Sequence, residues 1–186
     1  MPNLLQIGQI YKIKNMIKLK DILNEDNKNL DLNKLLDYLN EYNTPINNDS
    51  KIIEEYGRLK IQSDKVYDFG GSEYPIPNSV VVDIIKPEGN NRFIEQNLEN
   101  EFSLPPKDYI NVSSVIHFIN NKNNLVKSIN NSLKPGGLLI LKTSLNQIIK
   151  ILPYLSNYTP IEAQIDKEEI LGSEDNPDVI TIIFQK

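Results

Sequence analysis

The chain has 186 residues, enough for one domain with a substantial core, and its formal net charge of −5 does not favour a nucleic-acid-binding surface. The absence of cysteine excludes disulfides and thiolate metal sites, and a single histidine does not favour a histidine-based metal centre. No apolar run is long enough to cross a bilayer and the N-terminal stretch lacks a signal-peptide pattern, so a cytoplasmic location is expected.

Helical patterns dominate residues 1–62. The stretch DLNKLLDYLNEY, which begins at Asp31 as the expected N-cap, spaces four leucines along one face of a helix. The polar stretch NTPINNDS interrupts this pattern, and DSKIIEEYGRL restarts it with Ser50 in a capping position. We therefore expect residues 1–62 to form a helical N-terminal part.

Near Ser63 the pattern changes to short apolar runs that alternate with helical segments. Strands are expected within residues 65–71, 78–85, 92–98, 108–119, 136–144, 159–166 and 178–186, and helices within 123–133 and 145–152. Continuous apolar strands that alternate with helices are typical of a mostly parallel sheet covered on both faces. The sequence thus predicts a doubly wound α/β domain over residues 63–186. We expect this domain and the helical N-terminal part to form a single compact unit.

The stretch NNSLKPGGLLILKTS contains the end of the helix expected at residues 123–133, a short connection, and the strand expected at residues 136–144. Pro135 is expected to stop the helix at Leu133, and Gly136 and Gly137 permit backbone angles that other residues resist. The four apolar residues that follow can then enter the sheet interior directly.

The run from Asp108 to Ser144 resembles the second half of class I S-adenosylmethionine-dependent methyltransferases, in which Leu-Lys-Pro-Gly-Gly links a helix to an apolar strand. The stretches VYDFGG and VVVDII resemble the first strand with its glycine loop and the second strand of that family. The resemblance covers residues 66–186. It implies a mostly parallel seven-stranded sheet with an antiparallel last strand, and a helical N-terminal cap over the substrate.

The resemblance also implies S-adenosylmethionine as the cofactor and assigns it a site. Asp83 would accept hydrogen bonds from the ribose hydroxyls, and Asn97 would contact the adenine amino group. Ser113 and Ser114 would lie at the methionine end or near the transferred methyl group. The full set of implied cofactor-binding residues is Asp68, Gly70, Gly71, Asp83, Asn97, Ser113 and Ser114.

The glycine loop departs from the family pattern of acid-x-Gly-x-Gly-x-Gly. Asp83 follows Asp68 by only 15 positions, and Pro75 and Pro77 oppose a normal helix between them. The first helix is therefore expected to be missing or reduced to a turn. Three functions stay open. A methyltransferase acting on a small molecule or protein is slightly favoured over an inactive methyltransferase-like binding or regulatory protein, and a different reaction on the same cofactor, such as its cleavage, is a weaker third that no residue selects for. The inactive form would bind a protein partner or a second copy of the chain.

Two further residues have competing interpretations. His117, after the fourth strand, could be a general base, although a lone histidine is more often a partly buried structural residue. Lys142 resembles a lysine of RNA ribose 2′-O-methyltransferases, but no aspartate ends the fourth strand here. We therefore expect Lys142 to be the first solvated residue beyond a buried strand, and nucleic acid is not the favoured acceptor.

Overall fold

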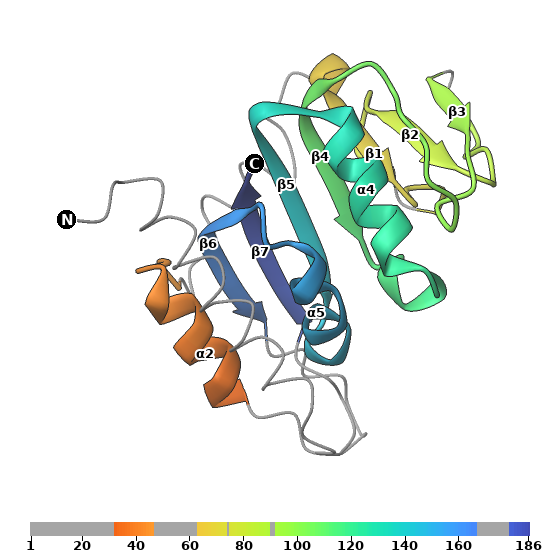
Figure 1. The fold of residues 1–186 in the computed structure, drawn as a ribbon. Coiled ribbons are helices and arrows are strands. Elements are labelled where there is room, and N and C mark those ends of the chain that lie inside the picture. Colours follow the sequence, from red (N-terminus) through yellow and green to blue (C-terminus); the bar gives the residue numbers. More distant parts are fainter. Residues whose placement is uncertain (1–31, 47–62, 74, 90–91, 167–178) are drawn as a thin grey trace, which may run out of the picture.

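A computed structural model of the chain describes residues 32–46, 63–73, 75–89, 92–166 and 179–186, and seven of its strands form one sheet (Figure 1). The strands are β1 (Val66–Phe69), β2 (Val80–Asp83), β3 (Phe93–Glu95), β4 (Lys107–Ser113), β5 (Leu133–Ser144), β6 (Thr159–Asp166) and β7 (Val179–Gln185). The helices are α2 (Leu32–Glu41), α4 (Lys122–Ser132) and α5 (Leu145–Ile151), with single 3₁₀ turns at Ser63–Lys65, Ile116–Phe118 and Leu152–Tyr154.

The strand order is β3-β2-β1-β4-β5-β7-β6. The first five strands run parallel to one another, and β7 is antiparallel to both β5 and β6. The predicted fold class is thereby confirmed. The chain proceeds from β1 outward to β3 and then returns to place β4 on the other side of β1. Ligands of open α/β sheets bind beyond the carboxyl ends of strands at such a reversal.

Apolar runs explain why the central strands are buried. Phe69, Val82 and Val112 are fully buried, and they come from β1, β2 and β4. Burial of this apolar surface is the main favourable term in folding, at about 25 cal/mol per Å². The carboxyl ends of three adjacent strands are therefore held in a rigid frame.

Helices α4 and α5 contact each other and pack on β5 (Figure 1). Each presents one apolar face, which buries Leu125 and Ile129 of α4 and Ile148 of α5. The three connections between β1 and β4 differ from this pattern, because the described residues of 70–79, 84–92 and 96–106 contain no α-helix. The first half of the sheet is therefore connected by loops.

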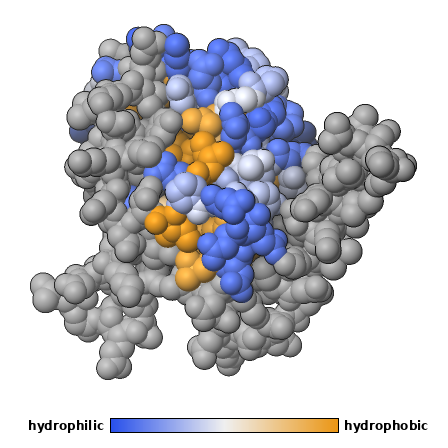
Figure 2. Space-filling view, turned by 90° about the vertical axis from the view of Figure 1, so that its left-hand side faces the viewer, coloured by the Kyte–Doolittle hydropathy of each residue, from blue (hydrophilic) through white to orange (hydrophobic). Residues whose placement is uncertain are grey.

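Helix α2 lies beside β6, at the end of the sheet farthest from β3 (Figure 1). Leu35 and Leu39, two of the four predicted leucines, are buried. The segment after α2 extends the sheet edge, because the amide of Ala163 donates to the carbonyl of Pro45 at 3.0 Å. Figure 2 shows the side of the molecule that is on the left in Figure 1, and on this side patches of hydrophobic residues lie between hydrophilic ones. The predicted cap at Asp31 and the helix after Ser50 lie outside the described residues.

Three boundaries differ from the sequence predictions. The strand expected over residues 108–119 ends at Ser113, because Ser114 adopts a positive φ of 56° that turns the chain away. The expected turn at residues 135–137 lies inside a bulge of β5, where Lys107 pairs with Leu133 and Tyr109 with Leu138. Between these two pairs, β5 contains more residues than β4, so the bulge lies on β5. The expected helix at 145–152 ends at Ile151 and continues as a 3₁₀ turn.

Candidate cofactor site

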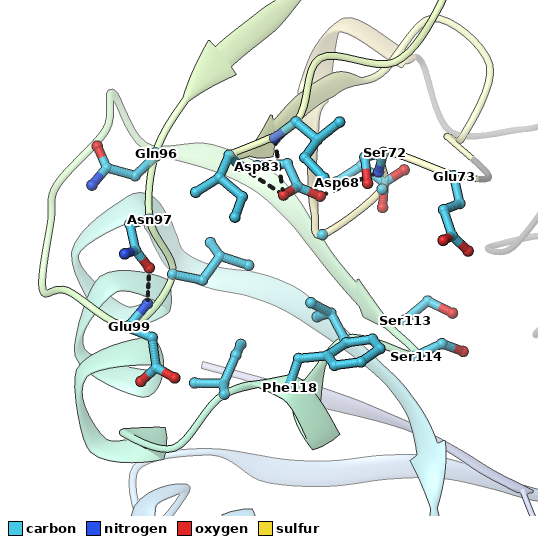
Figure 3. Close-up of a pocket in the computed structure, with 17 residues that line it drawn as sticks. Asp68, Ser72, Glu73, Asp83, Gln96, Asn97, Glu99, Ser113, Ser114 and Phe118 are labelled. Carbon is cyan, nitrogen blue, oxygen red and sulfur yellow. Dashed lines mark hydrogen bonds between the residues drawn. The ribbon is translucent and has the colours of Figure 1, made fainter.

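A cavity of about 500 Å³ lies at the carboxyl ends of β1, β2, β3 and β4 (Figure 3). All seven residues predicted to bind the cofactor line it, so the structure brings together residues from four separate strand ends. Ten further residues line the cavity and were not predicted: Ser72, Glu73, Ile84, Ile85, Gln96, Leu98, Glu99, Val115, Phe118 and Ile119. Of the described residues of the EYPIPNS segment, only Glu73 reaches the cavity.

Asp68 fastens the loop between β1 and β2. Its Oδ2 accepts a hydrogen bond from the amide of Ile76 at 2.8 Å, and its Oδ1 accepts one from Nδ2 of Asn111 at 2.8 Å. Burial raises the pKa of Asp68, these two hydrogen bonds lower it, and the charge of Asp83 raises it. A Cβ on Gly71 would lie 2.4 Å from Oδ2. The carboxylate thus holds a helix-free loop close to the strand ends.

Gly70 makes the sharp turn after β1. Its φ is +76°, in the region that residues with a Cβ resist, and its amide donates to the carbonyl of Val82 at 3.0 Å. A Cβ at this position would lie 2.5 Å from the Cβ of Val115. Only glycine therefore lets this loop and the segment after β4 approach each other beside the cavity.

Asp83 ends β2 and directs its carboxylate to the cavity wall (Figure 3). Its Oδ1 accepts from the amides of Ile84 at 2.6 Å and Ile85 at 3.4 Å, and its Oδ2 accepts from the amide of Ser72 at 3.3 Å. Each carboxylate oxygen has two lone-pair directions, and the group is only half-buried. Oδ2 thus retains capacity for a further donor.

Asn97 and Glu99 shape the wall after β3. Oδ1 of Asn97 accepts from the amide of Glu99 at 2.9 Å, which is a local Asx turn. The carboxylate of Glu99 accepts from the amides of Asn120 at 2.7 Å and Asn121 at 2.8 Å. These hydrogen bonds lower the pKa of Glu99. The wall is therefore tied to the segment that starts α4.

Ser113 ends β4 and Ser114 follows it, and both lie on the side of the cavity where Glu73 lies (Figure 3). The amide of Ser114 donates to the carbonyl of Lys142 at 2.9 Å. Lys142 itself pairs with Ser113 and Thr181, so it lies within β5. The expectation that Lys142 follows the strand was wrong, because β5 continues to Ser144.

His117 does not line the cavity. It is exposed in the 3₁₀ turn after β4, and its ring centroid lies 3.7 Å from that of Phe118. The expectation of partial burial was wrong, because the chain leaves the sheet at Ser114. Its neighbour Phe118 does line the cavity, so the geometry lends the predicted role of His117 as a base no support.

Three exposed apolar side chains contribute to the lining of the cavity. Ile84, Ile85 and Phe118 are 60%, 62% and 72% exposed, and all three line the cavity. Large apolar side chains that gather exposed at a cavity favour a ligand with an apolar flat part. The sequence signal for the first two is the pair of isoleucines directly after the acid that ends β2.

The left-handed conformation of Ser114 leads to a stability prediction. Replacing Ser114 by glycine is expected to raise the free energy of unfolding by about 0.5–1 kcal/mol, because glycine adopts a φ of 56° without the steric cost of a Cβ. Denaturant unfolding of both proteins measures the difference. Ser113→Gly, at a strand position, should lower the free energy of unfolding instead, and a gain there would contradict this explanation.

In the described ranges, no group of three or more His, Cys, Asp or Glu side chains is placed to hold a metal ion, and no helix is long and apolar enough to span a membrane.

Comparison with known proteins separates fold from sequence. No protein-family model and no curated protein matches the chain. Among solved structures, a TehB-like S-adenosylmethionine-dependent methyltransferase from Corynebacterium glutamicum aligns with a TM-score of 0.53 at 13% identity, covering 83% of this chain and 95% of that one.

Two further structures carry bound ligands. The N-methyltransferase NodS from Bradyrhizobium japonicum, in complex with S-adenosylhomocysteine, aligns with a TM-score of 0.52 at 13% identity and covers 92% of this chain and 98% of that one. The 1,6-didemethyltoxoflavin-N1-methyltransferase of Burkholderia thailandensis, with bound 1,6-didemethyltoxoflavin and S-adenosylhomocysteine, aligns with a TM-score of 0.52 at 12% identity. The alignment covers 100% of this chain and 91% of that one. At such low identity these likenesses speak to the fold alone.

Proposed function

We propose that this chain, which has the fold of class I S-adenosylmethionine-dependent methyltransferases, binds S-adenosylmethionine in the cavity and transfers its methyl group to a small-molecule or protein acceptor. One observation carries the proposal. The carboxylate of Asp83 stands at the end of β2 on the wall of a cavity, at the place where the strand order reverses.

The residues of the cavity fit the adenosine part of this cofactor. A volume of about 500 Å³ lies within the usual range of ligand pockets. Asp83 would accept hydrogen bonds from ribose hydroxyls, and a charged acceptor makes such bonds stronger than a neutral one. The apolar side chains of Ile84, Ile85 and Phe118 would cover the purine. Asn97 would contact the adenine amino group through the lone pair of Oδ1 that the Glu99 amide leaves available.

The turn after β1 would receive the methionine part. Gly70 and Gly71 expose backbone there, and Ser113 and Ser114 would lie toward the acceptor. When bound, the cofactor supplies an already activated methyl group. The contribution expected from this chain is alignment of the acceptor and exclusion of water, which together can account for a large part of a rate enhancement.

The alternative, an inactive binding or regulatory protein, has one observation in its favour. The loop between β1 and β2 has no helix in its described residues, and Asp68 and Asp83 already accept hydrogen bonds from the chain's own amides. In that case a protein partner or a second copy of the chain would replace the cofactor as the ligand of functional importance.

Titration calorimetry of the purified full chain with S-adenosylmethionine tests the proposal. The expected result is saturable binding in the micromolar range, accompanied by a rise in thermal stability through preferential binding to the folded state. Mass spectrometry of the small molecules that copurify provides an independent readout. A folded protein that gives no heat and no thermal shift at millimolar cofactor would refute the proposal and favour the inactive alternative.

A further inference from the structure

The lining of the cavity carries charge of one sign. Among the described lining residues there are four carboxylates, Asp68, Glu73, Asp83 and Glu99, and no lysine, arginine or histidine. A concave site with low-dielectric walls focuses the field of such groups. The site therefore favours a ligand with positive charge over one that is neutral or negative.

Three of these carboxylates are already held by donors of the chain. Asp68 accepts from Ile76 and Asn111, Asp83 from three backbone amides, and Glu99 from amides that precede α4. Their charge is partly compensated, and their positions are set by the fold.

Glu73 differs from these three. It is exposed, it lines the cavity, and no hydrogen bond or ion pair joins it to another residue of the described ranges. Its side chain lies on the side of Ser113 and Ser114, across the cavity from Gln96 and Asn97 (Figure 3). It is thus the lining carboxylate whose charge is left for a ligand, at the end where the methyl group would be transferred.

We infer that this cavity selects the methyl donor, which has a net positive charge, over its product, which has no net charge, and that Glu73 is the residue chiefly responsible for the selection. The inference rests on the proposed function. S-Adenosylmethionine carries an ammonium, a carboxylate and a sulfonium, and so has one net positive charge. During transfer the sulfur–carbon bond breaks, its electron pair stays on sulfur, and a lone pair of the acceptor forms the new bond to carbon. The positive charge passes to the acceptor, which releases a proton to solvent. S-Adenosylhomocysteine is then a neutral thioether species overall.

The consequence is that methyl transfer lowers the affinity of the cavity for the bound ligand, because the donor becomes the product. Opposite charges attract in proportion to the reciprocal of distance and dielectric constant, so the sulfonium gains from each nearby carboxylate while the thioether does not. Product would leave more readily than substrate, and inhibition by product would be weak. Because Glu73 is exposed, this selection should diminish as salt screens its charge.

Calorimetry at low and high salt, with S-adenosylmethionine and S-adenosylhomocysteine as probes, tests the inference. The wild-type chain is expected to bind the donor about tenfold more tightly than the product at low salt. Glu73→Gln should weaken donor binding about fivefold and change product binding by less than about twofold. Sinefungin, in which a carbon bearing an amine replaces the sulfonium, should follow the donor.

Glu95→Gln is the matched control, because Glu95 is exposed at the end of β3, beside the cavity but outside its lining. It removes the same charge and should leave the ratio of the two affinities unchanged. Equal affinity for donor and product in the wild-type chain overturns the inference and leaves the proposed function intact. Equal weakening of both ligands by Glu73→Gln also overturns it. Binding of neither ligand to the wild-type chain refutes the proposed function, and the inference with it.

Discussion

Replacing Asp83 by alanine is expected to lower the affinity for S-adenosylmethionine by about 100-fold, the equivalent of two lost hydrogen bonds to a charged acceptor. The carboxylate stands at the carboxyl end of β2, on the cavity wall, and retains capacity on Oδ2 for a ligand donor. Titration calorimetry on wild-type and variant proteins measures the ratio.

The same carboxylate also orders the chain around it, so a second variant is needed. Asp83 accepts from the amides of Ser72, Ile84 and Ile85, and alanine would disturb these loops as well as the ligand. Asp83→Asn keeps the shape and one acceptor oxygen but removes the charge, and about tenfold weaker binding is expected. Glu95→Gln, at the position paired with Asp83 on β3, is the control. Unchanged affinity in folded Asp83→Asn would remove this residue from the proposed site.

The second large effect concerns stability. Replacing Gly70 by alanine is expected to lower the free energy of unfolding by about 2–4 kcal/mol, through an unfavourable left-handed backbone and an overpacked contact. The backbone contributes because φ is +76°, and the contact because the new Cβ would lie 2.5 Å from the Cβ of Val115. Such a loss is a large fraction of the stability of an ordinary domain. Chemical denaturation measures it.

Gly136 separates the two causes. Its φ is +75°, but a Cβ at this position would meet no atom within 4 Å. Gly136→Ala should therefore lose only the backbone term, about 1 kcal/mol. If Gly70→Ala lowers the free energy of unfolding no more than Gly136→Ala does, the close approach of the turn to Val115 does not contribute to the loss of stability. In that case the glycine is required only for its backbone angle.

Periodicity was sufficient to predict most of the sheet. The β-branched and aromatic runs around Val66, Val80 and Tyr109 are strands in the structure, and the amphipathic segment before Leu133 is a helix. These predictions rest on local spacing, which decides which face of a segment can be buried. The end of β4 at Ser113 was missed because the positive φ of the next residue, Ser114, does not show in the spacing of apolar residues.

The candidate site was predictable in part. Asp83, Asn97 and the two serines were proposed from the resemblance to class I methyltransferases, and they line one cavity because the carboxyl ends of parallel strands meet at one edge of a sheet. Glu73 and Phe118 were missed as lining residues. One sits in a loop with two prolines, and the other beside the histidine that seemed the better candidate. Neither position has a local pattern that tells which way its side chain faces.

The order of apolar and polar residues along this chain determined by itself that there would be strands, where most of them run, and which acids would stand at their ends, because burial of apolar surface depends on short-range spacing. Tertiary structure alone decided how those acids are used. Asp68 accepts a hydrogen bond from Asn111, a residue 43 positions away, and holds a loop, whereas Glu73 has no such partner among the residues that the structure describes. Whether a carboxylate is satisfied by the protein or left for a ligand depends on groups that only folding brings within hydrogen-bonding distance.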